Sequence, residues 1–162
     1  MGTSKQNIFS RYQKTRMKLI AHRGLLNGPD VELENTPKQI EYALAMGYDV
    51  EVDVNFLPKL GFMLGHDALV HQVTYEWLSQ PGLWLHAKDF ETLRRLKSLN
   101  VFWHQDDEYT LTSKGYIWTV RGNVNDETVI CMPEWTYELD SLKHIDCYGV
   151  CSDYVEEIRK ML

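Results

Sequence analysis

The chain has 162 residues, 44% of them apolar and 25% charged, which is the composition of a single soluble globular domain. Its net charge of −6 and pI near 5.5 argue against a basic surface that binds nucleic acid or anionic membranes. No apolar run approaches the ~20 residues that span a bilayer, and no secretory signal begins the chain. We therefore expect no nucleic-acid partner, no stable membrane insertion and a cytoplasmic location.

Residues 1–16 are polar and basic and show no periodic pattern. We expect this stretch to be a disordered leader or a cloning remnant, followed by a single domain over residues 17–162.

The cysteines Cys131, Cys147 and Cys151 are odd in number and have no CxxC spacing. They predict thiols in a reducing compartment rather than a disulfide framework or a zinc site.

A β-strand and a helix are predicted at the start of the domain. The run Lys18–His22 has the pattern of a strand, and Gly24 permits a sharp turn after it. Thr36 and Pro37 are residue types preferred at the N-cap and at the first position of a helix. The apolar residues of that helix recur with helical spacing and predict a buried stripe of Ile40, Ala43 and Leu44.

The stretch Tyr48–Val54 comes next and carries two carboxylates on one face. Valines alternate with acidic residues along it, which is the period-two pattern of a strand. This alternation places Glu51 and Asp53 on the same face. Because adjacent carboxylates repel each other unless a cation lies between them, the pair favours a divalent metal site. The alternative is an edge strand with its valines on the core and its charges in water.

Further strands are predicted along the chain. After a turn at residues 58–61 comes the run Phe62–Asp67, and Leu83–Lys88 is the next clear strand. In that strand the alternating residues Trp84, His86 and Lys88 share one face. A helix over residues 89–99, with Asp89 as N-cap, is predicted to bury Phe90, Leu93 and Leu96.

The C-terminal half shows short strand signals with little helix between them. These signals cover residues 101–104, 116–120, 129–132 and 148–151. Asp153, with Glu156 three residues later, has the spacing of a capping box and predicts the start of a final helix.

Successive strand and helix signals predict a parallel sheet, and the placement of polar residues favours a barrel over an open sheet. Several strands end in polar residues, namely His22, Glu51, Asp53, His86, Lys88 and His104. A (β/α) barrel builds its site from such strand ends. Since the chain is shorter than the ~250 residues typical of that fold, we predict a reduced TIM (β/α) barrel with shortened or missing helices in its C-terminal half.

Four short motifs occur together in this order: His22-Arg23-Gly24, Glu34-Asn35-Thr36, Glu51-Val52-Asp53 and Gly65-His66-Asp67. In order and spacing they resemble the glycerophosphodiester phosphodiesterase family. Residues 116–120 and 148–153 resemble the last barrel strands of that family. The resemblance implies a metal-dependent enzyme of lipid metabolism that cleaves phosphodiesters on a TIM barrel.

The resemblance also implies roles for individual residues. His22 and His66 would be the acid/base pair, and Arg23 would hold a phosphate oxygen. Glu51 and Asp53 would be metal ligands. The substrate and the rim of the site would involve Glu34, Asn35, Lys88 and Trp118, where Trp118 either stacks on the substrate or packs in the core. Histidine suits both proton transfers because its ordinary pKa is ~6.5.

The chain departs from the family pattern at His86. The family has a glutamate two residues before the lysine that matches Lys88, and this glutamate completes the metal shell. Three roles remain for the imidazole: it binds the ion, it leaves the ion to Glu51 and Asp53 with waters and Glu34, or it is a hydrogen-bonding residue of the core. One divalent ion is expected, Mg²⁺, Mn²⁺ or Ca²⁺, with Mn²⁺ or Zn²⁺ favoured if His86 is a ligand.

The sequence therefore predicts metal-dependent hydrolysis of a small glycerophosphodiester-like substrate by two histidines. Two alternatives stay open. One is a non-catalytic phosphoester-binding module that has lost the third carboxylate. The other is a phospholipase-type lyase, in which a hydroxyl of the substrate attacks the phosphorus and a cyclic phosphate is released.

Overall fold

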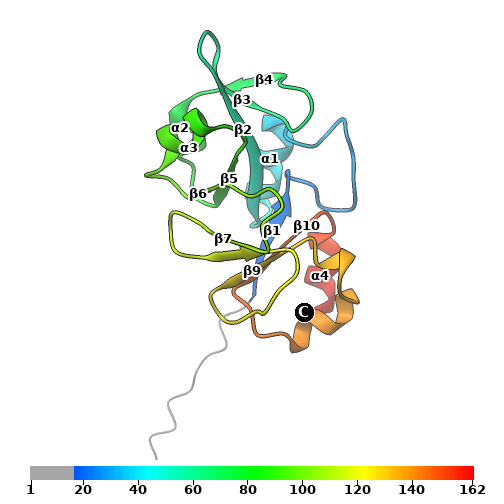
Figure 1. Ribbon diagram of the computed structural model, residues 1–162. Helices are drawn as coiled ribbons and strands as arrows, with labels where there is room; N and C mark the ends of the chain where they lie inside the picture. The colour runs from blue at the N-terminus through cyan, green and yellow to red at the C-terminus, as the bar shows by residue number, and fades with distance from the viewer. Residues whose placement is uncertain (1–16) are drawn as a thin grey trace, which may run out of the picture.

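The computed structural model describes residues 17–162, and the leader predicted over residues 1–16 lies outside this range. Within it, one mixed sheet contains the strands β1 (Lys18–His22), β2 (Asp49–Leu57), β3 (Gly61–Leu64), β4 (His71–Val73), β5 (Leu83–Ala87), β6 (Val101–Phe102), β7 (Tyr109–Leu111), β8 (Ile117–Thr119), β9 (Thr128–Cys131) and β10 (Gly149–Ser152). The helices are α1 (Pro37–Ala45), α2 (Tyr75–Leu78), α3 (Phe90–Leu96) and α4 (Val155–Met161), with 3-10 helices η1 (Pro133–Trp135) and η2 (Leu139–His144). The fold is thus mixed α/β with few helices (Figure 1).

Strand β2 is the centre of the sheet. It pairs in parallel with β1 and β5 and antiparallel with β3. The parallel strands follow the spatial order β6-β5-β2-β1-β10-β9-β8, and the antiparallel strands β3, β4 and β7 extend it. Glu51 and Asp53 are each only 1% exposed. The alternative of an edge strand with a solvated charged face is therefore wrong.

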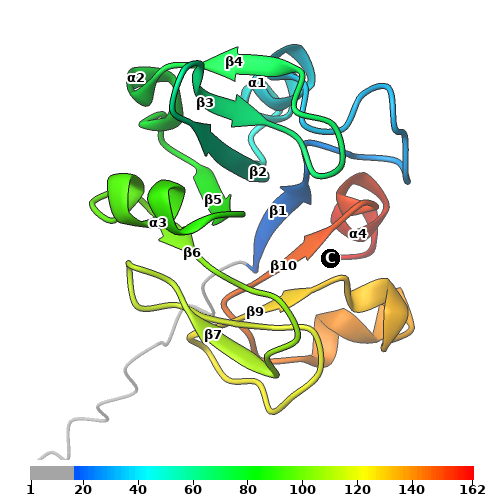
Figure 2. The same ribbon diagram turned by 45° about the horizontal axis from the view of Figure 1, so that its top comes forward.

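The sheet curls so strongly that strands far apart in this order touch across its inner face. Phe102 of β6 and Trp118 of β8 stack with ring centroids 4.4 Å apart, although five parallel strands separate β6 from β8. Trp84 of β5 packs on the same Trp118 ring. Figure 2 shows the strands arranged around this curved surface. The curled sheet is compatible with the reduced barrel that we predicted, and closure into a TIM barrel stays a prediction.

The outer face of the sheet carries the helices. Val50, Val52 and Val54 of β2 pack there in one cluster with α1 and with Leu96 of α3. Below them, Val150 of β10 packs with η2 and α4. Between β6 and β10 the described chain forms η1 and η2 but no α-helix, as predicted for the C-terminal half. No helix in residues 17–162 is long and apolar enough to cross a bilayer.

Two predictions about helix starts were wrong in part. Asp89 is the N-cap of α3 as predicted, but Phe90 is 70% exposed. The buried positions of α3 are Thr92 and Leu96, four residues apart, and Phe90 falls outside that stripe. Asp153 does not cap α4, which begins after Tyr154 without a side-chain cap. Its carboxylate binds His22 instead.

Candidate active site

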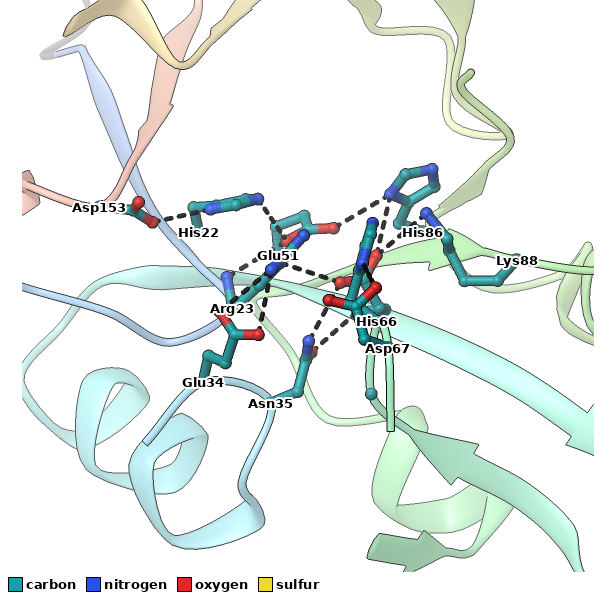
Figure 3. A network of polar contacts seen from close by, with 12 residues as sticks. His22, Arg23, Glu34, Asn35, Glu51, His66, Asp67, His86, Lys88 and Asp153 are labelled. Atoms are coloured by element: carbon teal, nitrogen blue, oxygen red, sulfur yellow. Dashed lines mark hydrogen bonds and ion pairs between the residues drawn. The ribbon is translucent and has the colours of Figure 1, made fainter. Parts of the chain in front are cut away.

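Polar side chains that lie on, or within two residues after, the six strands β1, β2, β3, β5, β6 and β10 line one cavity of about 520 Å³. It includes nine of the ten residues that we predicted for the site: His22, Arg23, Glu34, Glu51, Asp53, His66, His86, Lys88 and Trp118. The tenth, Asn35, lies behind Asp53. Figure 3 shows the histidines, carboxylates and cations of this group turned toward one another. The structure brings these residues together because β1, β2 and β5 are parallel neighbours whose carboxyl ends meet at one edge.

Glu51, Asp53 and His86 form the one group in the described part of the chain whose ligand atoms suit a metal ion. One donor atom from each of the three lies within 4.8 Å of the others. His86 Nδ1 is 3.4 Å from Glu51 Oε1 and 3.2 Å from Asp53 Oδ1. This group could hold a divalent ion.

The backbone fixes which nitrogen His86 presents. Its Nε2 lies 2.9 Å from the carbonyl oxygen of His104, which can only accept a hydrogen bond, so Nε2 carries the proton. Nδ1 is then the atom directed at the two carboxylates. A second-sphere carbonyl that fixes the tautomer in this way is typical of metal-binding histidines, so the residues present fit a metal ion.

Without a metal, His86 and Asp53 form a tight ion pair. Burial lowers the pKa of His86, but hydrogen bonds to Asp53 and Glu51 outweigh burial and raise it to about 9. Burial raises the pKa of Asp53, yet His86, Arg23 and Lys88 together hold it well below its usual range. An imidazolium therefore occupies the place between the carboxylates that a cation would otherwise fill.

Two further cations lie beside Asp53. Arg23 Nε is 3.0 Å from Asp53 Oδ2, and Lys88 Nζ is 3.5 Å from Asp53 Oδ1. Arg23 also donates from Nη1 to both oxygens of Glu34, at 3.1 and 3.0 Å. Guanidinium and ammonium groups in one cavity are the usual ligands of a phosphate.

Asn35 supports β2, the strand of the candidate metal ligands Glu51 and Asp53, from behind. Its Nδ2 donates to Asp53 Oδ2 and its Oδ1 accepts from the Asp53 backbone N–H, both at 3.0 Å. It is buried and has a left-handed φ of 55°, a conformation that asparagine tolerates better than most residues. The motif Glu34-Asn35 thus braces both Arg23 and Asp53.

His22 is held by a residue that sequence reasoning missed. Its Nδ1 lies 2.7 Å from Asp153 Oδ1, and its Nε2 faces Glu51 Oε2 at 3.9 Å. Burial lowers the pKa of His22, but the hydrogen bond to Asp153 and the charge of Glu51 outweigh it and raise the pKa to about 9. Asp153 follows β10 directly, so its position at a strand end was the signal that could have identified it.

His66 lies on the loop after β3 and is the most accessible of the site histidines. Its side chain is 38% exposed, and its Nδ1 lies 2.8 Å from Asp67 Oδ1. The loop is tied to β2 at Gly65, whose N–H donates to the Asp53 carbonyl and whose carbonyl accepts from Asn55 Nδ2. Backbone contacts therefore fix where His66 enters the cavity.

Trp118 and His104 line the inner part of the cavity. Trp118 is 1% exposed and stacks on Phe102, so its contacts are those of a packing residue, and contact with a substrate stays a prediction. His104 lines the same cavity, and burial followed by the charges of His86 and Lys88 lowers its pKa. His104 is thus a neutral wall residue near neutral pH.

Comparisons of the chain with protein-family models, with curated proteins and with solved structures find no match. The resemblance to the glycerophosphodiester phosphodiesterase family thus stays a prediction from the four motifs.

Proposed function

We propose that the chain is a metal-dependent phosphodiesterase, built on a reduced TIM barrel, that hydrolyses a small glycerophosphodiester-like substrate. One observation supports this most: a candidate metal group, two phosphate-binding cations and two histidines share one cavity. Phosphodiester hydrolysis needs a positive charge on the non-bridging oxygens together with a proton acceptor and a proton donor.

Glu51, Asp53 and His86 would hold one divalent ion, with His86 as an Nδ1 ligand. The ion would supply positive charge to the phosphate and orient it. Arg23 and Lys88 would bind the remaining phosphate oxygens once the substrate competes with Asp53 for them. Two carboxylates and one imidazole favour Mn²⁺ or Zn²⁺ over Ca²⁺.

His66 and His22 would carry the protons. His66 takes one proton from a water molecule, and the water oxygen forms a new bond to phosphorus. The bond from phosphorus to the leaving alcohol breaks, and His22 gives its Nε2 proton to the departing oxygen. Asp153 orients His22 for this step because it engages Nδ1 and leaves Nε2 toward the cavity. The products are a phosphomonoester and an alcohol.

The test is turnover of a glycerophosphodiester by the purified full chain after chelation and after addition of Mg²⁺, Ca²⁺, Mn²⁺ or Zn²⁺. We expect turnover to depend on added metal. Phosphorus NMR of the products separates hydrolysis, which yields a monoester, from the lyase reaction, which yields a cyclic phosphate. Absence of turnover with every metal, while the chain remains folded, would refute the proposal.

One observation favours a second candidate, a phosphoester-binding module. Asp53 contacts Arg23, Lys88 and His86 together, so its charge is compensated without a metal. Such a module would bind a phosphodiester equally well with and without chelator and would leave it intact. Calorimetric titration with a glycerophosphodiester under both conditions distinguishes it from the enzyme.

A further inference from the structure

Cys131 and Cys151 face each other across two neighbouring strands of the sheet. They are partners in the parallel pairing of β9 with β10, so their side chains emerge on the same face. Both belong to the buried cluster of the inner face that contains Phe102 and Trp118. Neighbouring strands lie about 4.7–4.9 Å apart, and the Cα atoms of a disulfide are about 4.4–6.8 Å apart. The backbone thus holds the two cysteines at a separation that a disulfide can bridge.

The two thiols differ in how a solute can reach them. Cys131 is 8% exposed and lines the cavity of the candidate active site, whereas Cys151 is 0% exposed. Burial, followed by a hydrogen bond with the Cys131 thiol, raises the pKa of Cys151 well above its ordinary value, so Cys151 keeps its proton near neutral pH. A small solute that enters the cavity therefore meets Cys131 first, and Cys151 is the neighbouring thiol that can react next.

The third cysteine, Cys147, lies in a different part of the core. It packs in one cluster with Leu142 and Val150 on the outer face of the sheet. Because successive residues of a strand point to opposite faces, Val150 and Cys151 of β10 point away from each other. The sheet therefore lies between Cys147 and the facing cysteines, and the chain supplies its own control for reactions of the pair.

The facing cysteines lie next to the residue that holds His22. Asp153, which engages His22 Nδ1 (Figure 3), follows Cys151 by two residues. Met132 follows Cys131 directly, and its N–H donates to the Cys151 carbonyl at 2.7 Å. The ends of β9 and β10 are thus tied together beside the cavity. A shift of one strand toward the other would therefore also shift Asp153.

We propose that Cys131 and Cys151 form a dithiol in the wall of the cavity that hydrogen peroxide oxidises to a disulfide. The Cys131 sulfur attacks one peroxide oxygen, the O–O bond breaks, and the departing hydroxide takes the thiol proton to give water and a sulfenic acid. The Cys151 sulfur then attacks the sulfenic sulfur, the S–O bond breaks, and a disulfide and a second water molecule form. Both sulfurs are oxidised, both peroxide oxygens are reduced, and a thiol reductant reverses the reaction.

The disulfide should lower turnover at the site. Its Cβ atoms lie about 3.8 Å apart, closer than the strand spacing, so β9 and β10 must draw together by about 1 Å beside Asp153. A displacement of that size next to a catalytic group such as His22 lowers the rate by about 10²-fold. The loss of turnover rests on the proposed function, whereas formation of the disulfide does not.

The direct test treats the reduced full chain with hydrogen peroxide and maps its peptides by mass spectrometry. We expect a crosslink between Cys131 and Cys151 that dithiothreitol removes, and alkylation in denaturant should then find one thiol in place of three. The same crosslink should form in Cys147→Ser, the matched control. Absence of the crosslink, sulfinic acid at Cys131 beside a reduced Cys151, or a crosslink to Cys147 would overturn the inference.

A second measurement compares turnover of a glycerophosphodiester before oxidation, after oxidation and removal of peroxide, and after reduction. We expect turnover to fall by about 10²-fold and to return with dithiothreitol. Cys151→Ala should keep its turnover through the same treatment. If the crosslink forms but the reduced chain cleaves no diester, the proposed function fails and the dithiol stands. If the reduced chain cleaves the diester but no crosslink forms, the reverse holds. Equal turnover of the crosslinked and reduced chains would overturn the effect on the site.

Discussion

Asp53 contacts three cationic side chains, those of Arg23, His86 and Lys88. These contacts hold all three residues in the site. Arg23 and Lys88 approach its two oxygens as phosphate ligands would, while His86 approaches from the side of Glu51. Because Asp53 is 1% exposed, these partners and Asn35 replace the water that a carboxylate otherwise needs. Single substitutions of the partners of Asp53 should therefore separate the proposed metal binding at His86 from the proposed phosphate binding at Arg23 and Lys88.

The two histidines assigned to proton transfer give the first prediction. His22→Ala or His66→Ala should lower phosphodiester turnover by roughly 10²–10⁴, the usual contribution of a positioned acid or base. His66→Ala should change the free energy of unfolding by no more than ~0.5 kcal/mol because the side chain is partly exposed. Steady-state kinetics and urea unfolding check both values. His144→Ala, at an exposed histidine of η2, is the control, and full activity in both site variants would contradict the assignment.

His86 gives the second prediction, which concerns the metal. His86→Glu replaces the nitrogen ligand by a carboxylate, so preference should move from Mn²⁺ or Zn²⁺ toward Mg²⁺ or Ca²⁺. In the unsubstituted chain, metal affinity should also fall as pH is lowered, since protons compete for Nδ1. Metal titrations of both proteins at two pH values measure these changes. Identical preference and identical pH dependence would mean that His86 is a structural residue.

At the scale of elements, the sequence predicted those features of strands and helices that depend on a few neighbouring residues. The alternation in β2, the N-cap Thr36 of α1 and the N-cap Asp89 of α3 were all predicted, because each signal lies within a few residues. The short elements β4, β7 and α2 were missed, since three or four residues carry no period and depend on their partners. Asp153 matched a capping pattern but binds a histidine 131 residues away, a contact that local spacing cannot reveal.

The loop between β3 and β4 gives the third prediction, at Gly65. A Cβ there would lie 1.8 Å from the Ala68 carbonyl oxygen, and the φ of 139° is strained for other residues. Gly65→Ala should move the neighbouring His66 and lower turnover by about 10²-fold, as expected for a misplaced catalytic group. Its unfolding free energy should fall by roughly 1–3 kcal/mol.

Gly61→Ala is the matched control for this loop. Gly61 has a φ of 81°, but a Cβ there has no atom within 4 Å. It should lose stability through backbone strain and keep its turnover. Equal turnover in the two variants would show that the backbone at Gly65 does not position His66.

At the scale of the whole molecule, the two faces of the curled sheet separate the charged side chains of β2 from its apolar side chains. The valines of β2 pack outward against α1 and α3, while its carboxylates point into the cavity. Beside the inner packing of Phe102 and Trp118, the strand ends bring the buried carboxylates of Glu51 and Asp53 close to the imidazoles of His22 and His86. The stability of the fold should therefore depend on the protonation of the site and, under the proposed function, on its metal occupancy.

The last prediction follows from that coupling. In metal-free protein the pKa values of His22 and His86 are raised from 6.5 to about 9. Their stabilising contribution is then fully present below pH 6.5 and is lost as pH rises through about 9, because the folded state binds protons that the unfolded state has released. With chelator present, the unfolding free energy should fall over this window by on the order of 2–3 kcal/mol per histidine, less than additively since both face Glu51.

Urea unfolding of the chelated chain at several pH values between 6 and 9.5 measures this loss, and His86→Gln should flatten the curve by removing one of the two titrations. Mn²⁺ should counteract the loss at high pH, because the ion takes the place of the proton between Glu51 and Asp53. At a free concentration of 100 times its Kd, a bound ion adds about 2.7 kcal/mol to the unfolding free energy. Stability that is flat from pH 6.5 to 9 in the unsubstituted chain, or the same slope in His86→Gln, would show that the imidazolium does not hold the two carboxylates together.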